Sequence, residues 1–179
     1  TKPKHGHFVY DHEGTRAKPH LVVKDGTLVA FLHSLESAAK LGGQPEGSAR
    51  AQSHHNPPII RMSNTYFAPG DMSFDEVLEG IELGVYLAGS QYGYVETQKG
   101  QFTAKAEEGW LIEKGELTEH LRDVAINGLT LEALKNVTAM GKDFKMDFPG
   151  MCGKLSQSMY VDNGSPHMRI EGIVVGGRR

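Results

Sequence analysis

The sequence has no long apolar run and no apolar signal core near its start. No segment approaches the roughly 20 consecutive apolar residues that span a bilayer. The polar opening Thr1-Lys2-Pro3-Lys4 is not followed by the apolar stretch of a secretory signal. These absences favour a soluble protein of the cytoplasm. The chain also begins without Met, which indicates processing or truncation of a longer protein.

The chain also lacks a block of like charges and has a single cysteine. Nineteen basic and 22 acidic side chains give a formal net charge of −3. Binding to nucleic acid through its phosphates requires a clustered basic face, so direct nucleic-acid binding is not expected. Cys152 cannot form an internal disulfide. A lone cysteine indicates a reducing compartment or a special use of the thiol.

The composition is that of a folded protein. Of the 179 residues, 39% are hydrophobic and 23% are charged, which predicts a single domain over residues 1–179. Twenty-two widely spaced glycines separate short segments rich in Val, Ile, Leu, Tyr and Phe. This pattern favours antiparallel strands over long helices. We therefore expect an α+β fold, mainly antiparallel β-sheet with about three short helices packed on it.

Two hairpins and a terminal turn stand out. Residues 21–32 carry Asp25-Gly26, a pair that adopts the positive φ angles of a tight turn. Residues 110–121 repeat this layout around Gly115. A turn at Asp162-Asn163-Gly164 is expected to separate a strand over residues 157–161 from a closing strand over residues 168–175.

Three short helices are predicted from start signals and apolar spacing. Ser73 and Glu76 form a capping box, which begins a helix that we expect to reach about Leu83. A second helix is expected over Ser34–Leu41 and a third from Thr130 to about Val137. The polar stretch from Gly42 to Pro58 predicts a surface loop.

Cys152 is the first candidate for chemistry. It lies between Gly150 and Gly153, small neighbours that leave a sulfur accessible, and Lys154 can stabilise a thiolate. The other interpretation is a small buried hydrophobic side chain without a chemical role.

The histidines near the start do not form a zinc-peptidase motif. His7 and His12 are five residues apart, but the position after His7 holds Phe8, whereas the motif requires a glutamate there as base. We interpret His5, His7 and His12 as dispersed, solvated side chains. The same holds for His54 and His55.

A substrate contact is the second candidate. Arg61, Asn64 and Tyr66 alternate along a segment that leaves a proline-rich loop, and they could hold a peptide by hydrogen bonds. Alternatively, these side chains satisfy buried backbone groups in a tight turn.

One segment carries a family resemblance. Ile60-Arg61-Met62-Ser63-Asn64-Thr65-Tyr66 resembles the TldD/PmbA family, once labelled modulators of DNA gyrase and understood as peptidases. Further similar segments follow in the family's order across nearly the whole chain: Tyr10-Asp11-His12-Glu13-Gly14, Gly84-Val85-Tyr86, Gly100-Gln101-Phe102, Trp110-Leu111-Ile112-Glu113 and Val174-Val175-Gly176-Gly177.

The resemblance gives Cys152 a role. Met151-Cys152-Gly153-Lys154 is similar to the TldD branch, whose cysteine ligates zinc together with two histidines of an HExxxH helix. The resemblance thus implies that Cys152 is a metal ligand. This sequence contains no HExxxH. We therefore expect an N-terminally truncated metallopeptidase, with zinc in the full-length parent, and a chain that alone binds zinc poorly and hydrolyses nothing.

The resemblance also implies partners. These are an identical or paralogous subunit of the family and an unfolded peptide substrate, held as an added strand. A non-catalytic peptide-binding or dimerisation module, in which Cys152 is merely packed, is the alternative. Direct action on gyrase or DNA finds no basic surface in this composition.

Overall fold

The chain divides into two compact units, each built from two separate stretches of sequence. The structure, a computed structural model, describes residues 4–178. Unit 1 contains the residues up to 68 together with residues 144–165, and unit 2 contains residues 69–143 together with those from 166 onward. Whether the units fold as the one domain expected over residues 1–179 stays a prediction.

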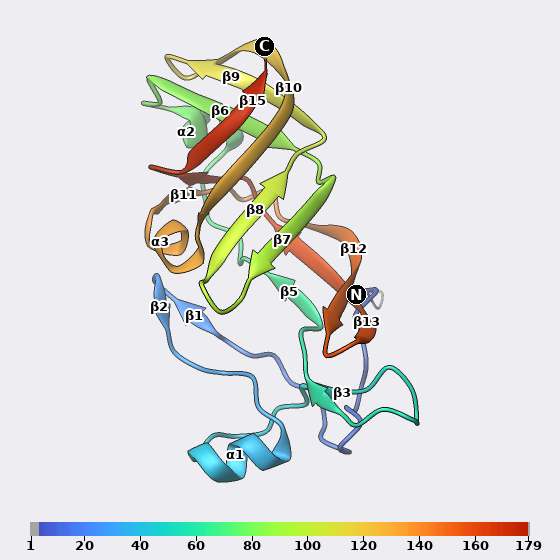
Figure 1. Cartoon of the computed structure of the whole chain (residues 1–179). Coiled ribbons are helices and arrows are strands. Elements are labelled where there is room, and N and C mark those ends of the chain that lie inside the picture. Colours follow the sequence, from blue (N-terminus) through green and yellow to red (C-terminus); the bar gives the residue numbers. More distant parts are fainter. Residues whose placement is uncertain (1–3, 179) are drawn as a thin grey trace. The chain divides into compact units, whose positions relative to one another are not determined.

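Unit 2 is organised around a twisted antiparallel sheet. Its strands are β6 (Leu83–Ala88), β7 (Tyr92–Glu96), β8 (Gln101–Lys105), β9 (Glu108–Glu113), β10 (Glu116–Leu129) and β15 (Val174–Arg178). The strand order is β6-β9-β10-β8-β7, and β15 also pairs with β10. The 14-residue β10 joins the sheet because it pairs with β9 along its first part and with β8 and β15 along its second (Figure 1).

Smaller elements complete unit 2. The strands β11 (Val137–Met140) and β14 (Met168–Ile170) form an antiparallel pair, and α2 (Phe74–Leu78) and α3 (Thr130–Lys135) are short helices. The buried apolar side chains of this unit are Val77, Leu78, Ala106, Ile112, Leu121, Val124 and Ala139. Val124 is the most enclosed, with 2% of its surface exposed. The core of unit 2 therefore lies between β9, β10 and α2.

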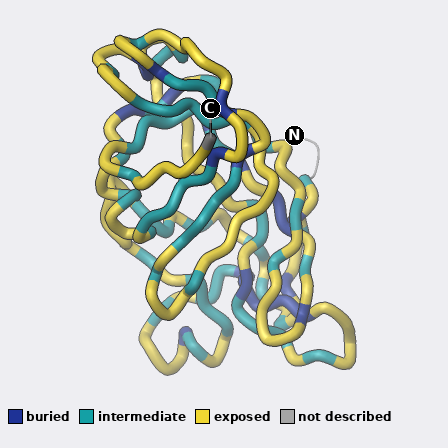
Figure 2. The backbone as a smooth tube through the Cα atoms, turned by 45° about the horizontal axis from the view of Figure 1, so that its top comes forward, coloured by how far each residue is buried: buried dark blue, intermediate teal, exposed yellow. Residues whose placement is uncertain are grey.

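Unit 1 carries a long hairpin with a parallel third strand. Its strands β12 (Lys145–Lys154) and β13 (Gln157–Ser165) are antiparallel, and β5 (Asn64–Tyr66) lies parallel to β13. Two minimal sheets pair β1 (Val23–Lys24) with β2 (Thr27–Leu28) and β3 (Ala49–Arg50) with β4 (Ile59–Ile60). The single helix described in this unit is α1 (Leu35–Leu41). Figure 2 shows that buried stretches are short and alternate with exposed ones.

The expected fold class is confirmed. The strands are antiparallel except at the β13–β5 pairing, and three short helices accompany them. The hairpin at Asp25-Gly26 forms with φ angles of 48° and 73°, although its strands have two residues each. The second predicted hairpin is β9 and β10, which turn at Lys114 and Gly115.

The predicted helices begin where expected, but two end early. Ser34 and Ser73 both form capping boxes. The helix expected from Ser73 to about Leu83 stops at Leu78, because Gly80 adopts a φ of 77° and Leu83 begins a strand. The third helix ends at Lys135 rather than near Val137, which opens β11.

The predicted turn at residues 162–164 is wrong. Strand β13 continues through it to Ser165 and pairs with β12, so the expected terminal hairpin does not form. Asp162 is 3% exposed, and its carboxylate accepts the N–H of Phe148 at 3.0 Å. At Gly164 a Cβ would lie 3.0 Å from the carbonyl oxygen of Lys145. These turn-forming residues serve instead as a buried acceptor and a point of close strand approach.

The surface loop predicted from Gly42 to Pro58 is also partly wrong. Its middle, Ser48 to Ala51, is buried and contains β3. The backbone there is fixed from the N-terminal segment, since Asp11 accepts the N–H of Ala49 at 3.0 Å and the N–H of His12 donates to the Ala49 carbonyl.

Within residues 4–178, no helix is long and apolar enough to cross a membrane.

Candidate functional site

Cys152 lies near the tip of the β12–β13 hairpin in unit 1. It is directly opposite Met159, and its side chain is half-buried. Three and four residues further along, Leu155 and Ser156 make the turn with φ angles of 48° and 57°. Positive φ at both central residues is the geometry of a tight hairpin turn, which Asn and Gly adopt far more readily than Leu and Ser. The turn beside Cys152 is therefore held by its surroundings.

Arg61 links the two strands of this hairpin. Its side chain is 3% exposed, and its Nη2 donates to the carbonyl oxygens of Cys152 and of Gln157, the latter at 2.8 Å. One guanidinium nitrogen thus joins the backbone of β12 to that of β13. The remaining nitrogens Nε and Nη1 are buried and have no hydrogen-bond partner among residues 4–178.

Arg50 is a second buried arginine in the same interior, and the sequence did not indicate it. It donates from Nη1 to the carbonyl of Met62 and from Nη2 to that of Tyr160, both at 2.8 Å, and it stacks over the ring of Phe8 at 4.7 Å. Burial lowers the pKa of Arg50, as does the charge of Arg61, while Cys152 opposes the shift. The guanidiniums of Arg50 and Arg61 and the sulfur of Cys152 therefore share one electrostatic environment.

Glutamines and a lysine add further tethers at the hairpin tip. The buried Gln157 donates from Nε2 to the Pro57 carbonyl at 3.1 Å and accepts the N–H of Gln52 at 3.0 Å. Gln52 in turn accepts the N–H of Ser158 at 2.6 Å. Lys154 donates to the carbonyl of Ile60 at 2.8 Å. The segment that carries Cys152 is thus fixed on several sides.

The other two sequence candidates lie on β5 of the same sheet. Asn64 is opposite Asp162, and its Oδ1 accepts the N–H of Gly6 at 2.9 Å. Tyr66 is 55% exposed and packs edge-to-face on Phe144 at 5.5 Å. Arg61 and Asn64 bind backbone groups, as the second interpretation proposed. Binding of substrate by Arg61, Asn64 and Tyr66 stays a prediction.

The described residues do not form a complete metal site. In the part of the chain that the structure describes, no three His, Cys, Asp or Glu side chains are grouped so that they could hold a metal ion. His5, His7, His12, His54 and His55 are exposed. His12 accepts the N–H of Ala51 through Nδ1 at 2.7 Å. Half-buried Cys152 suits one zinc ligand position, and the described residues do not provide the remaining ones.

Unit 2 contains a hydrogen-bonded chain that the sequence did not reveal. The ring of His167 contacts the Asp143 carboxylate through Nδ1 and the Tyr86 hydroxyl through Nε2, the latter at 2.9 Å. Phe74 packs on both rings, with centroid distances of 4.7 Å to His167 and 5.2 Å to Tyr86. The three polar residues come from distant parts of the sequence, so no local motif could have indicated them.

The surroundings lower the pKa of Asp143 and raise that of Tyr86. Burial raises the pKa of Asp143, but the N–H, ring and charge of His167 outweigh this, and the pKa lies below its usual value. Burial raises the pKa of Tyr86, with contributions from Asp143 and Glu108. Tyr86 therefore retains its proton and is not an activated nucleophile. The group forms a structural link between residues 141–143 and His167.

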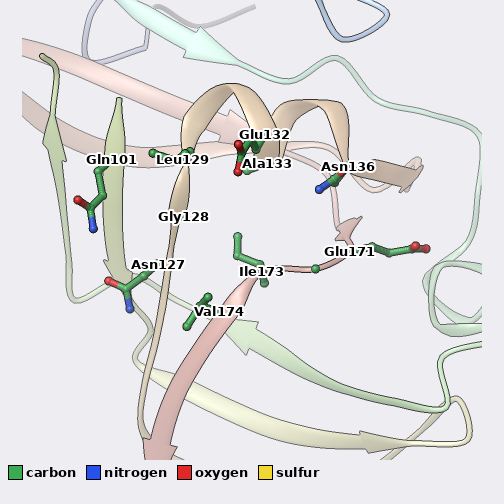
Figure 3. Close-up of a pocket in the computed structure, with 11 residues that line it drawn as sticks. Gln101, Asn127, Gly128, Leu129, Glu132, Ala133, Asn136, Glu171, Ile173 and Val174 are labelled. Atoms are coloured by element: carbon green, nitrogen blue, oxygen red, sulfur yellow. The ribbon is translucent and has the colours of Figure 1, made fainter. Parts of the chain in front are cut away.

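A separate pocket of about 310 Å³ opens in unit 2 (Figure 3). Carboxamides and carboxylates, including Gln101, Asn127, Glu132 and Glu171, surround a floor formed by Leu129, Ile173 and Val174. None of the four sequence candidates lines it.

The chain is similar to a family of known proteins. A family described as the PmbA/TldA metallopeptidase C-terminal domain matches residues 1–177. A metalloprotease of Methanothermobacter thermautotrophicus is 48% identical over 172 residues, which cover 96% of this chain and 37% of that protein. The zinc metalloprotease TldD homolog of Saccharolobus solfataricus is 38% identical over 175 residues, 98% of this chain and 39% of that protein.

Solved structures share the fold. A proposed modulator of a DNA gyrase from Thermotoga maritima aligns with a TM-score of 0.72 and 24% identity over 96% of this chain and 36% of that one. TldE of Thermococcus kodakarensis aligns with a TM-score of 0.70 and 19% identity over 95% of this chain and 36% of that one. The chain therefore spans little more than a third of the length of the relatives it matches.

Proposed function

Because the chain belongs to the PmbA/TldD metallopeptidase family, as its C-terminal domain, we propose that it is part of a zinc-dependent peptidase that cleaves unfolded peptides. In this proposal Cys152 supplies one metal ligand, and this domain forms part of the substrate groove. The chain alone is inactive, since the remaining ligands and the base would come from residues outside it. We also propose a cytoplasmic location, because a lone cysteine suits a reducing compartment.

The position of Cys152 carries the proposal. The only cysteine of the sequence is half-buried on the β12–β13 hairpin of unit 1, where Arg61 and the carboxamides of Gln52 and Gln157 fix the backbone around it. A packed cysteine without a role needs no such fixation. A metal ligand does, because a metal site requires its donor atoms at defined distances.

Zinc, when bound, would supply an activated water and a Lewis acid for peptide hydrolysis. The residues of this chain would position it and the substrate around it. Cys152 would present its thiolate from β12, and the exposed Tyr66 on β5, the strand on the far side of β13 in the same sheet, would offer an aromatic contact to a peptide.

A non-catalytic peptide-binding or dimerisation module is the second candidate. It is favoured by β7, the edge strand of the large sheet, on which Tyr92, Tyr94 and Val95 are 53%, 64% and 51% exposed. Edges of this kind accept an added strand from a peptide or a second subunit. The partner in either case would be an unfolded peptide and an identical or paralogous family subunit.

Replacement of Cys152 by Ser in the full-length parent separates these functions. The expected result is loss of bound zinc, measured by elemental analysis of the purified protein, together with loss of peptide hydrolysis. Cys152→Ser changes one atom and leaves the hairpin hydrogen bonds in place, so a cooperative unfolding transition close to that of zinc-free wild type serves as the folding control. Full zinc content in the variant would favour the binding module.

A further inference from the structure

We propose that Arg61 is the positioning residue for Cys152, acting through the backbone of the hairpin rather than through contact with substrate. The inference rests on the proposed role of Cys152 as a metal ligand. It assigns to Arg61 a task different from the peptide contact predicted from the sequence.

The hydrogen bonds of Arg61 support this assignment. Its Nη2 binds the carbonyl of Cys152 itself and the carbonyl of Gln157 on the returning strand. These two residues lie on opposite sides of the turn at Leu155 and Ser156. A single rigid guanidinium therefore fixes the ligand residue relative to the turn that would otherwise relax.

The burial of Arg61 excludes direct contact with a peptide that lies on the described surface. The side chain is 3% exposed, and its backbone N–H donates to the Ser48 carbonyl at 2.9 Å. The guanidinium is thus enclosed by the same segments that carry Arg50. A peptide on the surface would meet Cys152, which is half-buried, before it could reach Arg61.

The unpaired nitrogens Nε and Nη1 of Arg61 oppose folding. Buried donors without partners destabilise a folded protein, and each calls for an explanation. Attachment of the hairpin alone does not require a buried Arg61, because Gln157 and Lys154 already tether the tip through satisfied bonds. A planar, permanently charged group that reaches both strands does provide rigidity at Cys152.

Residues that hydrogen-bond to a metal ligand have a known effect when they are removed. Loss of such a partner weakens metal binding about 10- to 100-fold because the ligand is no longer held in its productive orientation. The same order of effect is expected here, although the contact acts through a backbone carbonyl.

The test uses the full-length parent with cobalt(II) in place of zinc. Thiolate coordination to cobalt(II) gives a sulfur-to-metal charge-transfer band, which reports the Cys152 bond independently of activity. Arg61→Met is expected to weaken cobalt and zinc affinity about 10-fold or more and to reduce or shift the band. Arg61→Lys, which keeps the charge but not the planar group, is expected to lie between wild type and Arg61→Met.

Arg169→Met is the matched control. Arg169 also donates to a backbone carbonyl, that of Glu79 at 2.8 Å, but it lies in unit 2. It is expected to lower the unfolding midpoint while leaving the band and the metal affinity unchanged. A merely structural role for Arg61 would make both Met variants behave alike.

Two results overturn the inference. One is wild-type affinity and an unchanged band in folded Arg61→Met. The other, which decides the matter if Arg61→Met does not fold, is wild-type affinity and an unchanged band in Arg61→Lys. Cys152→Ser distinguishes failure of the premise, because a Cys152→Ser protein that keeps metal and band would refute the ligand role itself, whatever the Arg61 variants show.

Discussion

The buried charged side chains described in unit 1 form their hydrogen bonds with backbone atoms rather than with one another. In unit 1, Arg50 and Arg61 donate to four backbone carbonyls, and the buried Asp11 and Asp162 accept backbone N–H groups. These bonds add to the strand pairing of unit 1, where β12 and β13 are long but β3, β4 and β5 have only two or three residues each.

Asp143 permits a test of one charge in unit 2. Asp143→Asn is expected to lower the free energy of unfolding by about 1 kcal/mol at neutral pH, because it weakens charge-assisted hydrogen bonds from His167. The folded-state pKa of Asp143 lies below the ordinary value of 3.8. Its stabilisation is therefore complete above that value and is lost as pH falls through the folded-state pKa.

Urea denaturation at pH 7 and at about pH 3 measures this dependence. The difference in free energy of unfolding between wild type and Asp143→Asn should become smaller at the lower pH. Asp147→Asn is the control, since Asp147 is 84% exposed in its ion pair with Lys4, and exposed pairs contribute little. A difference that stays constant with pH would refute the charged role of Asp143.

Single residues also mark the limit of what the sequence reveals. Cys152 was found because of its type and its neighbours, and Arg61 because it alternates with Asn64 and Tyr66 along a segment that leaves a proline-rich loop. Arg50 was missed because it lies in a polar stretch that resembles a loop, and its importance arises from Met62 and Tyr160, which are distant in sequence. Contacts of this kind depend on the tertiary fold and leave no local pattern.

The hairpin turn at Leu155 and Ser156 stores conformational strain. Both residues adopt positive φ, which disfavours side chains with a Cβ. Leu155 is 74% exposed and contributes little packing. We expect Leu155→Asn combined with Ser156→Gly to raise the free energy of unfolding by about 1 to 2 kcal/mol.

Chemical denaturation of the double variant checks this expectation. Gly115→Ser is the opposite substitution at the equivalent turn position. Gly115 is the second turn residue of the β9–β10 hairpin and has a φ of 79°. That variant is expected to lose about 1 kcal/mol. If both hairpins respond in the same direction, strain is not the cause.

Elements were predictable where their signals are local. The capping box at Ser73, the helix start at Ser34 and the turn at Asp25-Gly26 were identified because cap and turn chemistry involves residues within four positions of one another. The strand through Asp162-Asn163-Gly164 was not, because its partner β12 overrides the turn propensity of those residues. The pairing of β5 with β13 across nearly a hundred residues has no sequence signal of this kind.

The overall charge of the molecule leads to a prediction about DNA. A formal charge of −3 without a block of basic residues gives no phosphate-binding face. The chain is therefore expected to leave duplex DNA unshifted in a gel at physiological salt. A shift that weakens as salt is raised would show electrostatic binding and would revive a direct action on DNA.

The division into two interleaved units has a consequence for synthesis and inheritance. The chain passes between the units at residues 68/69, 143/144 and 165/166. During vectorial synthesis on the ribosome, unit 1 lacks the hairpin of Cys152 until about residue 165 has been made, by which time unit 2 still lacks β15. Neither unit is a contiguous segment that recombination could exchange. A genetic exchange that breaks the chain between residues 69 and 165 would divide both units, so evolution is expected to transmit them as one.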